Sequence, residues 1–262
     1  MRMLSSIHNF TRSLVAAIAM LLLAAPVVAS AQAELAEGPR TLIINYRADA
    51  ADRTAFRQHM AGPFAKKLAS LRAAGGLSSY EVYYSWYRQP GVWDAMAVLH
   101  FPDYAAVRKW QAVERASPGG LDAAGLALGA PVATFSADLS WEKSVDDLDV
   151  GEVYYVIPYS YREAAEYREY VAGYVLPQFD GWIREGALSG YQLYMNRYSV
   201  GAPWDSLFIQ RYRDFDAFGK RQSVLDKVRV GLREKPEWMA WHKRKADIRS
   251  ETENSIAELI AH

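Results

Sequence analysis

The chain of 262 residues contains no cysteine. This absence excludes disulfides, thiolate nucleophiles, cysteine-ligated zinc and iron–sulfur clusters. The 30 Lys and Arg residues are balanced by 30 Asp and Glu residues, so the chain lacks the basic excess that normally accompanies nucleic-acid binding. The motifs GxSxG, GxGxxG, HExxH and the phosphate-binding loop are also missing. A functional site in this chain therefore has to be built from histidine, carboxylate, tyrosine and arginine side chains.

Aromatic residues, by contrast, are plentiful. The chain has 17 Tyr, 9 Phe and 8 Trp, and 51% of its residues are hydrophobic. This composition is typical of a folded protein with a packed core.

The N-terminal segment has the pattern of a secretory signal peptide. Arg2 and Arg12 precede an apolar run over residues 14–28, and small residues follow at 29–33. The run of about 15 residues is shorter than the roughly 20 needed to span a bilayer. We expect a signal peptide over residues 1–33, cleaved after Ala31 or Ala33, then a linker over 34–40. The mature protein is then periplasmic or secreted, without stable membrane insertion. An uncleaved anchor is the alternative.

A repeat of 111 residues runs through the rest of the chain. Residues 75–83 (GGLSSYEVY) match residues 186–194 (GALSGYQLY), and Trp93-Asp94 matches Trp204-Asp205. Without any gap, 21 of 108 pairs are identical between Thr41/Glu152 and Leu148/Leu259, against about six or seven expected by chance. The sequence therefore predicts a first repeat over 41–148, a linker over 149–151 and a second repeat over 152–262.

Each repeat has the pattern of a β-α-β-β-α-β unit. Short β-branched and aromatic runs at 41–47 and 153–157 predict first strands, and helical periodicity follows each of them. Pro63 and Pro177 lie inside those helical patterns and predict a kink or a late start. Residues 80–88 with 93–101, and 191–199 with 204–212, predict hairpins. The last strands are expected near 134–143 and 248–254.

This order and duplication resemble the dimeric α+β barrel superfamily, which includes antibiotic-biosynthesis monooxygenases, NIPSNAP-type proteins, chlorite dismutases and dye-decolorising peroxidases. No stretch aligns residue by residue with one family's signature. We therefore expect an α+β fold of two tandem ferredoxin-like repeats packed sheet to sheet. The resemblance implies a cavity that suits a small aromatic substrate or haem.

Strand alternation suggests a tyrosine-rich ligand site. One face of the second strand carries Tyr83 and Tyr87 in the first repeat, and Tyr194, Asn196 and Tyr198 in the second. Arg197, which replaces Trp86, is a further candidate ligand-binding residue. These side chains are able to orient a planar ligand through few hydrogen bonds. Alternatively, the repeated tyrosines fill the seam between the two sheets.

The candidate catalytic residues are His100 and Arg211, which occupy the same repeat position. A single site in a duplicated barrel needs only one copy of each group, so their divergence suggests an imidazole for proton transfer and a guanidinium for anion binding. The alternative is that both are solvated strand-end residues. Asp94 and Asp205 are either general bases or acceptors of backbone N–H groups, and the structural role is favoured.

No cofactor and no metal are predicted, although haem is possible with His242 as its ligand, in the aromatic segment 238–242. The alternative is a packed helix face with His242 at its rim. Two functions remain open: an exported protein that binds a small, partly aromatic ligand, or an oxidoreductase that is either a cofactor-poor monooxygenase or haem-dependent. The residues leave open whether the protein is an enzyme. A homo-oligomer is possible.

Overall fold

The computed structural model describes residues 40–147, 149 and 152–262. The predicted signal peptide, nearly all of the predicted linker over 34–40 and most of the linker over 149–151 lie outside these residues. Among the helices that are described, none has the length and apolar character needed to cross a membrane.

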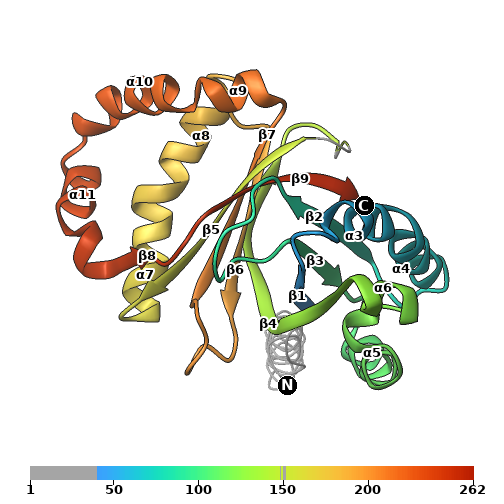
Figure 1. Ribbon diagram of the computed structural model, residues 1–262. Helices are drawn as coiled ribbons and strands as arrows, with labels where there is room; N and C mark the ends of the chain where they lie inside the picture. Colours follow the sequence, from blue (N-terminus) through green and yellow to red (C-terminus); the bar gives the residue numbers. More distant parts are fainter. Residues whose placement is uncertain (1–39, 148, 150–151) are drawn as a thin grey trace, which may run out of the picture. The chain divides into compact units, whose positions relative to one another are not determined.

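Each repeat contains the predicted elements in the predicted order (Figure 1). The first repeat comprises β1 (Thr41–Ala48), α3 (Arg53–His59), η1 (Met60–Phe64), α4 (Ala65–Ala73), β2 (Ser79–Ser85), β3 (Ala95–His100), α5 (Tyr104–Ala116), η2 (Pro118–Gly120), α6 (Ala123–Leu128) and β4 (Gly129–Ser144). The second comprises β5 (Val153–Tyr161), α7 (Ala164–Tyr170), η3 (Val171–Val175), α8 (Leu176–Arg184), β6 (Gly190–Asn196), β7 (Ser206–Tyr212), α9 (Phe215–Gly219), α10 (Arg221–Arg233), α11 (Pro236–Ile248), β8 (Arg249–Glu251) and β9 (Ser255–Ala261).

The first helical segment of each repeat passes through a π-helical turn. Pro63 lies within the turn η1, and Pro177 lies in the first turn of α8, directly after the turn η3. A proline cannot donate an intrahelical hydrogen bond, and a π turn widens the helix at such a position. The helices therefore continue across both prolines through a local change of winding.

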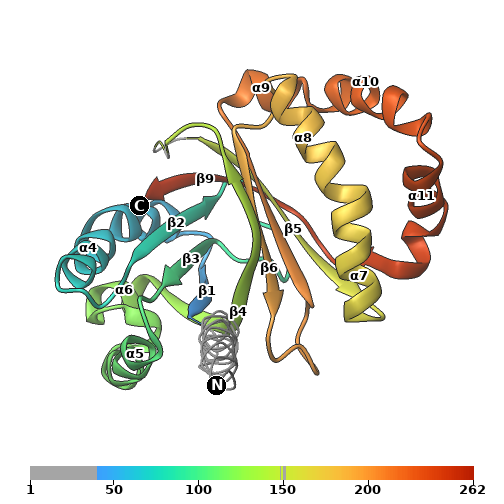
Figure 2. The ribbon, with the colours of Figure 1, turned by 180° about the vertical axis from the view of Figure 1, so that it is seen from behind.

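The strands form a closed barrel. Their order is β7-β6-β4-β1-β3-β2-β9-β5, and β5 pairs with β7 to complete the ring, while β8 is an additional short strand on β5. Strand β4 of the first repeat pairs with β6 of the second, and β9 of the second repeat pairs with β2 of the first. The repeats therefore share strands in one continuous sheet, and the helices lie outside it (Figures 1 and 2).

The gapless register of the repeat is wrong at its last strand. Ile43 pairs with Phe135, and its repeat counterpart Tyr154 pairs with Ala257, which lies 122 residues after Phe135 rather than 111. The residue 111 positions after Phe135 is Ala246, which lies in helix α11. The second repeat therefore has a longer helical segment before its last strand. The strand predicted near 248–254 is in fact the end of α11 and the short β8, and the main strand β9 follows it.

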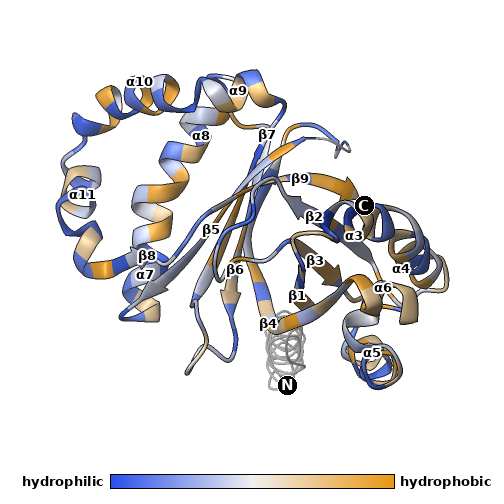
Figure 3. Ribbon diagram, viewed as in Figure 1, coloured by the Kyte–Doolittle hydropathy of each residue, from blue (hydrophilic) through white to orange (hydrophobic). Residues whose placement is uncertain are grey.

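Three apolar clusters form the core. One lies between the sheet and the helices of the first repeat, and one between the sheet and the helices of the second. The third lies inside the barrel and contains Tyr83, Tyr154, Tyr194, Trp93 and Trp204. Helices α10 and α11 alternate between hydrophobic and hydrophilic residues (Figure 3), as expected for helices with one buried face.

Candidate binding site inside the barrel

A cavity of about 660 Å³ opens at one end of the barrel. Strand alternation directs every second side chain of each strand into the barrel, so the cavity wall combines residues from both repeats. The wall consists of Ser78, Ser79, Glu81, Tyr83, His100, Leu139, Glu142, Lys143, Ser144, Tyr154, Gly190, Tyr191, Gln192, Ile209 and Arg211. Its volume is in the range typical of pockets for small molecules.

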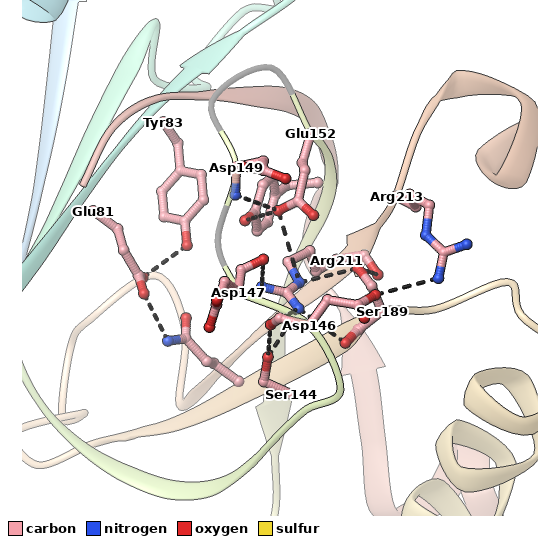
Figure 4. Close-up of polar contacts among 12 residues, drawn as sticks. Glu81, Tyr83, Ser144, Asp146, Asp147, Asp149, Glu152, Ser189, Arg211 and Arg213 are labelled. Atoms are coloured by element: carbon pink, nitrogen blue, oxygen red, sulfur yellow. Dashed lines mark hydrogen bonds and ion pairs between the residues drawn. The ribbon is translucent and has the colours of Figure 1, made fainter.

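Glu81 on β2 is the most deeply buried carboxyl group of this wall. Its side chain is nearly inaccessible, with 4% of the residue exposed. The Tyr83 hydroxyl donates a hydrogen bond to Oε2 at 2.8 Å, and Nε2 of Gln192 donates to Oε1 at 3.0 Å (Figure 4). Burial raises the pKa of Glu81, because removal from water disfavours the carboxylate, although both donors oppose the shift. Glu81 therefore holds its proton more tightly than an exposed glutamate does.

The partner of Glu81 is also its repeat counterpart. Gln192 lies 111 residues after Glu81, as Tyr194 does after Tyr83. The barrel thus brings equivalent positions of the two repeats into contact, and one of them has a carboxyl where the other has an amide. The ring of Tyr83 lies edge-on against Tyr154, with 4.8 Å between the ring centroids.

His100 on β3 is held through both ring nitrogens. Nδ1 lies 3.2 Å from Oγ1 of Thr41, and Nε2 lies 3.2 Å from the Tyr194 hydroxyl. Burial lowers the pKa of His100, because the imidazolium is disfavoured away from water. The side chain is therefore a neutral imidazole with one donor and one acceptor nitrogen at neutral pH.

Arg211 on β7 is 3% exposed and secures the segment that follows β4. Its Nη2 donates to Oγ of Ser144 at 2.8 Å and to the carbonyl of Asp146 at 2.7 Å, and its Nε donates to Oγ of Ser189 at 3.0 Å (Figure 4). Oε2 of Glu152 lies 3.8 Å from Nε. Most of the guanidinium donors are thus engaged within the protein, which leaves little capacity to hold an anionic ligand.

The two repeats differ in the contacts made at the position that His100 and Arg211 share. His100 contacts Thr41, and Arg211 contacts Glu152, the repeat counterpart of Thr41. Burial raises the pKa of Glu152, while the charge of Arg211 opposes that shift. The Tyr154 hydroxyl donates to Glu152 at 3.0 Å. One repeat therefore has a neutral polar pair, where the other has a charged one.

The structure brings some of the predicted site residues together and separates others. Tyr83, His100 and Arg211 line the cavity, and the Tyr194 hydroxyl contacts the His100 ring. Tyr87 and Tyr198 are exposed by 57% and 69%, and neither lines this cavity.

Asn196 and Arg197 bond to neighbouring chain segments. Nδ2 of Asn196 donates to the carbonyl of Trp204, and its Oδ1 accepts from the backbone N–H of Tyr198. Arg197 forms an ion pair with Asp138 at 3.3 Å. Their predicted role in ligand binding remains a prediction.

Asp94 and Asp205 have the same structural role in both repeats. Asp94 accepts a hydrogen bond from the backbone N–H of Ala48, and Asp205 accepts one from Tyr161. Arg53 forms an additional ion pair with Asp94 at 3.0 Å. These contacts tie the third strand of each repeat to the end of its first strand, which agrees with the structural role favoured from the sequence.

Sequence reasoning missed the carboxyl groups of the site. Glu81 lies two residues before Tyr83, so strand alternation continued by one step identifies it as inward-facing. Glu152 and Tyr154 are related to Thr41 and Ile43 by the same repeat, which is the signal that was available for them.

The surroundings of His242, the predicted haem ligand, leave little room for a haem group. Nδ1 of His242 is hydrogen-bonded with the Tyr174 hydroxyl at 2.9 Å, and its ring stacks on Trp238 with 5.2 Å between centroids. The adjoining space lined by Tyr174 has a volume of about 80 Å³, well below the roughly 300 Å³ of the smallest typical ligand pockets. His100 has both ring nitrogens engaged. His100 therefore has no free ring nitrogen for an axial bond, and at His242 it is the small volume beside Tyr174 that opposes haem.

Solved structures with this fold come from several groups of proteins. An anthrone oxidase-like protein is 11% identical, with a TM-score of 0.52 over 87% of this chain and 93% of its own. A chlorite dismutase variant from Candidatus Nitrospira defluvii is 10% identical, with a TM-score of 0.51 over 85% and 91%. A haem-binding protein from Thermus thermophilus is 13% identical, with a TM-score of 0.50 over 85% and 91%.

No protein-family model matches the chain, and no curated protein matches it in sequence. At such low identities, the likeness to solved structures concerns the fold alone, and it agrees with the fold predicted from element order and duplication. The chain therefore has the fold of the dimeric α+β barrel proteins, formed here by two ferredoxin-like repeats of a single chain.

Proposed function

We propose that this protein is exported and binds a small, partly aromatic molecule in the cavity at the end of the barrel. The observation that carries the proposal is the buried cluster of Glu81, Tyr83 and Gln192 in the wall of a cavity of about 660 Å³. A buried carboxyl group is costly even when it is hydrogen-bonded. A ligand that forms hydrogen bonds with Glu81 offsets part of this cost.

The chemistry of the wall favours a neutral aromatic ligand with hydroxyl or carbonyl groups. Tyr83 of β2 and Tyr154 of β5 give the cavity an aromatic wall, in which the two rings pack edge-on against each other. Protonated Glu81 donates a hydrogen bond, and ionised Glu81 accepts one. Most donors of Arg211 are engaged with the segment after β4, and Lys143 is paired with Asp180, so a strongly anionic ligand finds little available counter-charge. Phenols and quinones match this description.

A second candidate function is a small-molecule oxidoreductase that needs no haem. The placement of Glu81 favours it, because a carboxylate next to a bound phenol accepts the hydroxyl proton and activates the ring toward oxidation. Dioxygen is the oxidant in this alternative. The same fold in an anthrone oxidase-like protein is consistent with such chemistry.

Calorimetric titration of the purified protein with a panel of phenols and quinones tests the proposal. We expect Tyr83→Phe to weaken binding by up to about tenfold, because Glu81 loses a donor that holds its carboxyl group in place, and such a hydrogen bond is worth about 1.5 kcal/mol at most. Tyr87→Phe is the matched control, because Tyr87 is exposed and lies outside the cavity. Equal effects of the two substitutions, or no binding of any member of the panel, would contradict the proposal.

Two further measurements separate the alternatives. Oxygen consumption with a bound phenol, lost in Glu81→Gln, supports the oxidoreductase, whereas binding without consumption supports a binding protein. A haem titration followed in the Soret region is expected to show no saturable band. A band that disappears in His242→Ala would instead establish haem binding near α11.

A further inference from the structure

A second, smaller pocket lies between the sheet and the helices of the second repeat, and residues of α8, α10 and β5 line it. We refer to it as the arginine pocket, because Arg221, Arg229 and Arg249 line it together with Tyr170 and Gln178. Its volume is about 80 Å³. It is distinct from the cavity inside the barrel, since the two lie on opposite faces of the sheet.

The three guanidinium groups are held in place but retain unused donors. Nε of Arg229 donates to Oε1 of Gln178 at 2.8 Å, and Gln178 is itself 3% exposed. Nε of Arg249 donates to the Tyr170 hydroxyl at 3.3 Å. An arginine has five N–H donors, so Arg229 keeps further donors, and so does Arg249 although its Nη1 also donates to Glu251 at 3.1 Å.

Arg221 is held by aromatic side chains and by a hydrogen bond with Tyr212. Its guanidinium carbon lies 4.7 Å from the centre of the Tyr155 ring. Its Nε is buried and has no hydrogen-bond partner among the residues that the structure describes. A buried donor without an acceptor costs roughly 1–3 kcal/mol, more when the group is charged. A bound acceptor removes that cost.

The pocket has an excess of positive charge. Among the described residues that line it, Glu251 is the one carboxylate, and it forms an ion pair with Arg249 at 3.1 Å. Arg233 and Lys245 lie close enough to His242 for their charges to lower its pKa. Burial, Arg229 and Arg249 lower the pKa of Lys245, and burial, Lys245 and Arg229 lower the pKa of His242. Repulsion from neighbouring cations contributes to both shifts, which indicates that positive charge gathers around the pocket.

The first repeat has no equivalent of this arrangement among its described residues. The residue 111 positions before Arg221 is Trp110, which is buried in the first-repeat core with 4% exposed. Tyr170 corresponds to His59, whose Nε2 lies 3.4 Å from Asp122. In one repeat the position is therefore filled by an apolar ring, and in the other it presents a cation. This difference points to a role beyond packing.

We propose that the arginine pocket binds a small oxyanion, namely a carboxylate or a phosphate-sized group. The planar fork of a guanidinium matches two oxygens of such a group and forms charge-assisted hydrogen bonds with them. The volume holds only a few water molecules or one such group. An aromatic carboxylate is able to place its carboxylate in the pocket only if its ring stays at the mouth.

Calorimetric titration of the purified protein with inorganic phosphate and with benzoate, at an ionic strength kept constant with chloride, tests this proposal. We expect saturable binding with one site, and we expect Arg229→Gln to raise the Kd by at least about tenfold, as the loss of a charge-assisted hydrogen bond requires. Arg108→Gln is the matched control. It removes the same charge from an exposed position of α5 in the other repeat.

The two ligands separate the possible sources of the anion. Binding of phosphate alone supports a free tetrahedral oxyanion, and binding of benzoate alone supports the carboxylate of an aromatic molecule. Absence of saturable binding of both up to about 10 mM would overturn the proposal. So would equal affinities of Arg229→Gln and Arg108→Gln.

Arg229 also donates a hydrogen bond to Gln178, so Arg229→Gln is able to weaken binding through a folding defect. Arg221→Gln is a second variant that tests the pocket without breaking that bond. This substitution removes no hydrogen bond at Nε, although it does remove the contact of the guanidinium with the Tyr155 ring, so its urea midpoint is measured as well. It should weaken binding of the anion by a similar factor. An unchanged affinity in Arg221→Gln would exclude Arg221 from the site.

Discussion

Glu81 combines deep burial with two hydrogen-bond donors, Tyr83 and Gln192. Donors stabilise the carboxylate and burial stabilises the acid, and burial is the larger effect here because the pKa is raised. The group therefore binds its proton more tightly in the folded protein than in the unfolded chain. That difference makes the free energy of unfolding depend on pH.

Glu81→Gln is expected to flatten this pH dependence. Below the ordinary pKa of 4.5, both states of the wild type are protonated at this site. As the pH rises above it, the unfolded chain releases the proton first, so the free energy of unfolding falls until the raised pKa is passed. Urea unfolding at intervals between pH 4.5 and 7 measures the slope, and the variant should lack up to one proton of linkage.

Tyr87→Phe is the control for that experiment, since its side chain is exposed and should leave the slope unchanged. Glu152 and Glu253 also have raised pKa values, so the free energy of unfolding should still depend on pH in every variant. A slope in Glu81→Gln as steep as that of the wild type would show that Glu81 ionises at its ordinary pKa.

The sequence identified His100 and Arg211 as one diverged position but not their surroundings. Their shared repeat position is a property of the sequence. The contacts of His100 with Tyr194, and of Arg211 with Ser144 and the segment after β4, join residues distant along the chain. Such contacts depend on barrel closure and have no local sequence signal.

At the scale of elements, helix α8 packs closely on α10 through a glycine. A Cβ atom on Gly181 would overlap Cγ1 of Val228 on α10. Elsewhere in a helix, replacing glycine by alanine stabilises by about 0.5–1 kcal/mol through lower backbone entropy. At this contact the steric overlap outweighs that gain.

Gly181→Ala is therefore expected to lower the free energy of unfolding by about 1–3 kcal/mol, the usual cost of an overpacked core. Urea denaturation measures the change. In a Val228→Ala background, the substitution should be close to neutral, because the overlapping methyl groups are gone.

Gly231→Ala on α10 is the matched control. A Cβ atom added at Gly231 would meet no described atom within 4 Å, so alanine should stabilise the protein by up to about 1 kcal/mol. If both glycine substitutions are stabilising, helix α8 is able to move away from α10 at no cost and the close contact is not needed.

At the scale of the whole molecule, the two repeats are joined by strands that cross between them. Strand β4 pairs with β6, and β9 pairs with both β2 and β5. Arg57 in the first repeat also forms a two-pronged ion pair with Glu258 in the second, at 2.8 and 2.7 Å. Neither repeat completes its hydrogen bonds alone, so they should unfold together.

Leu68→Ala tests this coupling. Leu68 is fully buried in the first-repeat core, and its truncation should cost about 2–5 kcal/mol. Tryptophan fluorescence, which includes Trp182 and Trp238 of the second repeat, and far-UV circular dichroism should shift to the same lower urea midpoint. A separate part of the fluorescence change that stays at the wild-type midpoint would show that the second repeat unfolds independently.

The sequence by itself determined the fold class and the duplication, because strand and helix periodicity and repeated motifs are local properties of the chain. It also placed Tyr83, Tyr194, His100 and Arg211 at matched positions. Tertiary structure alone decided which of these side chains meet, since barrel closure pairs β4 with β6 and β9 with β2. It likewise decided the register of the last strand, displaced by the extra helical residues of α11, and the convergence of three arginines from α10 and β8. Contacts between distant segments follow from packing, which local pattern does not encode.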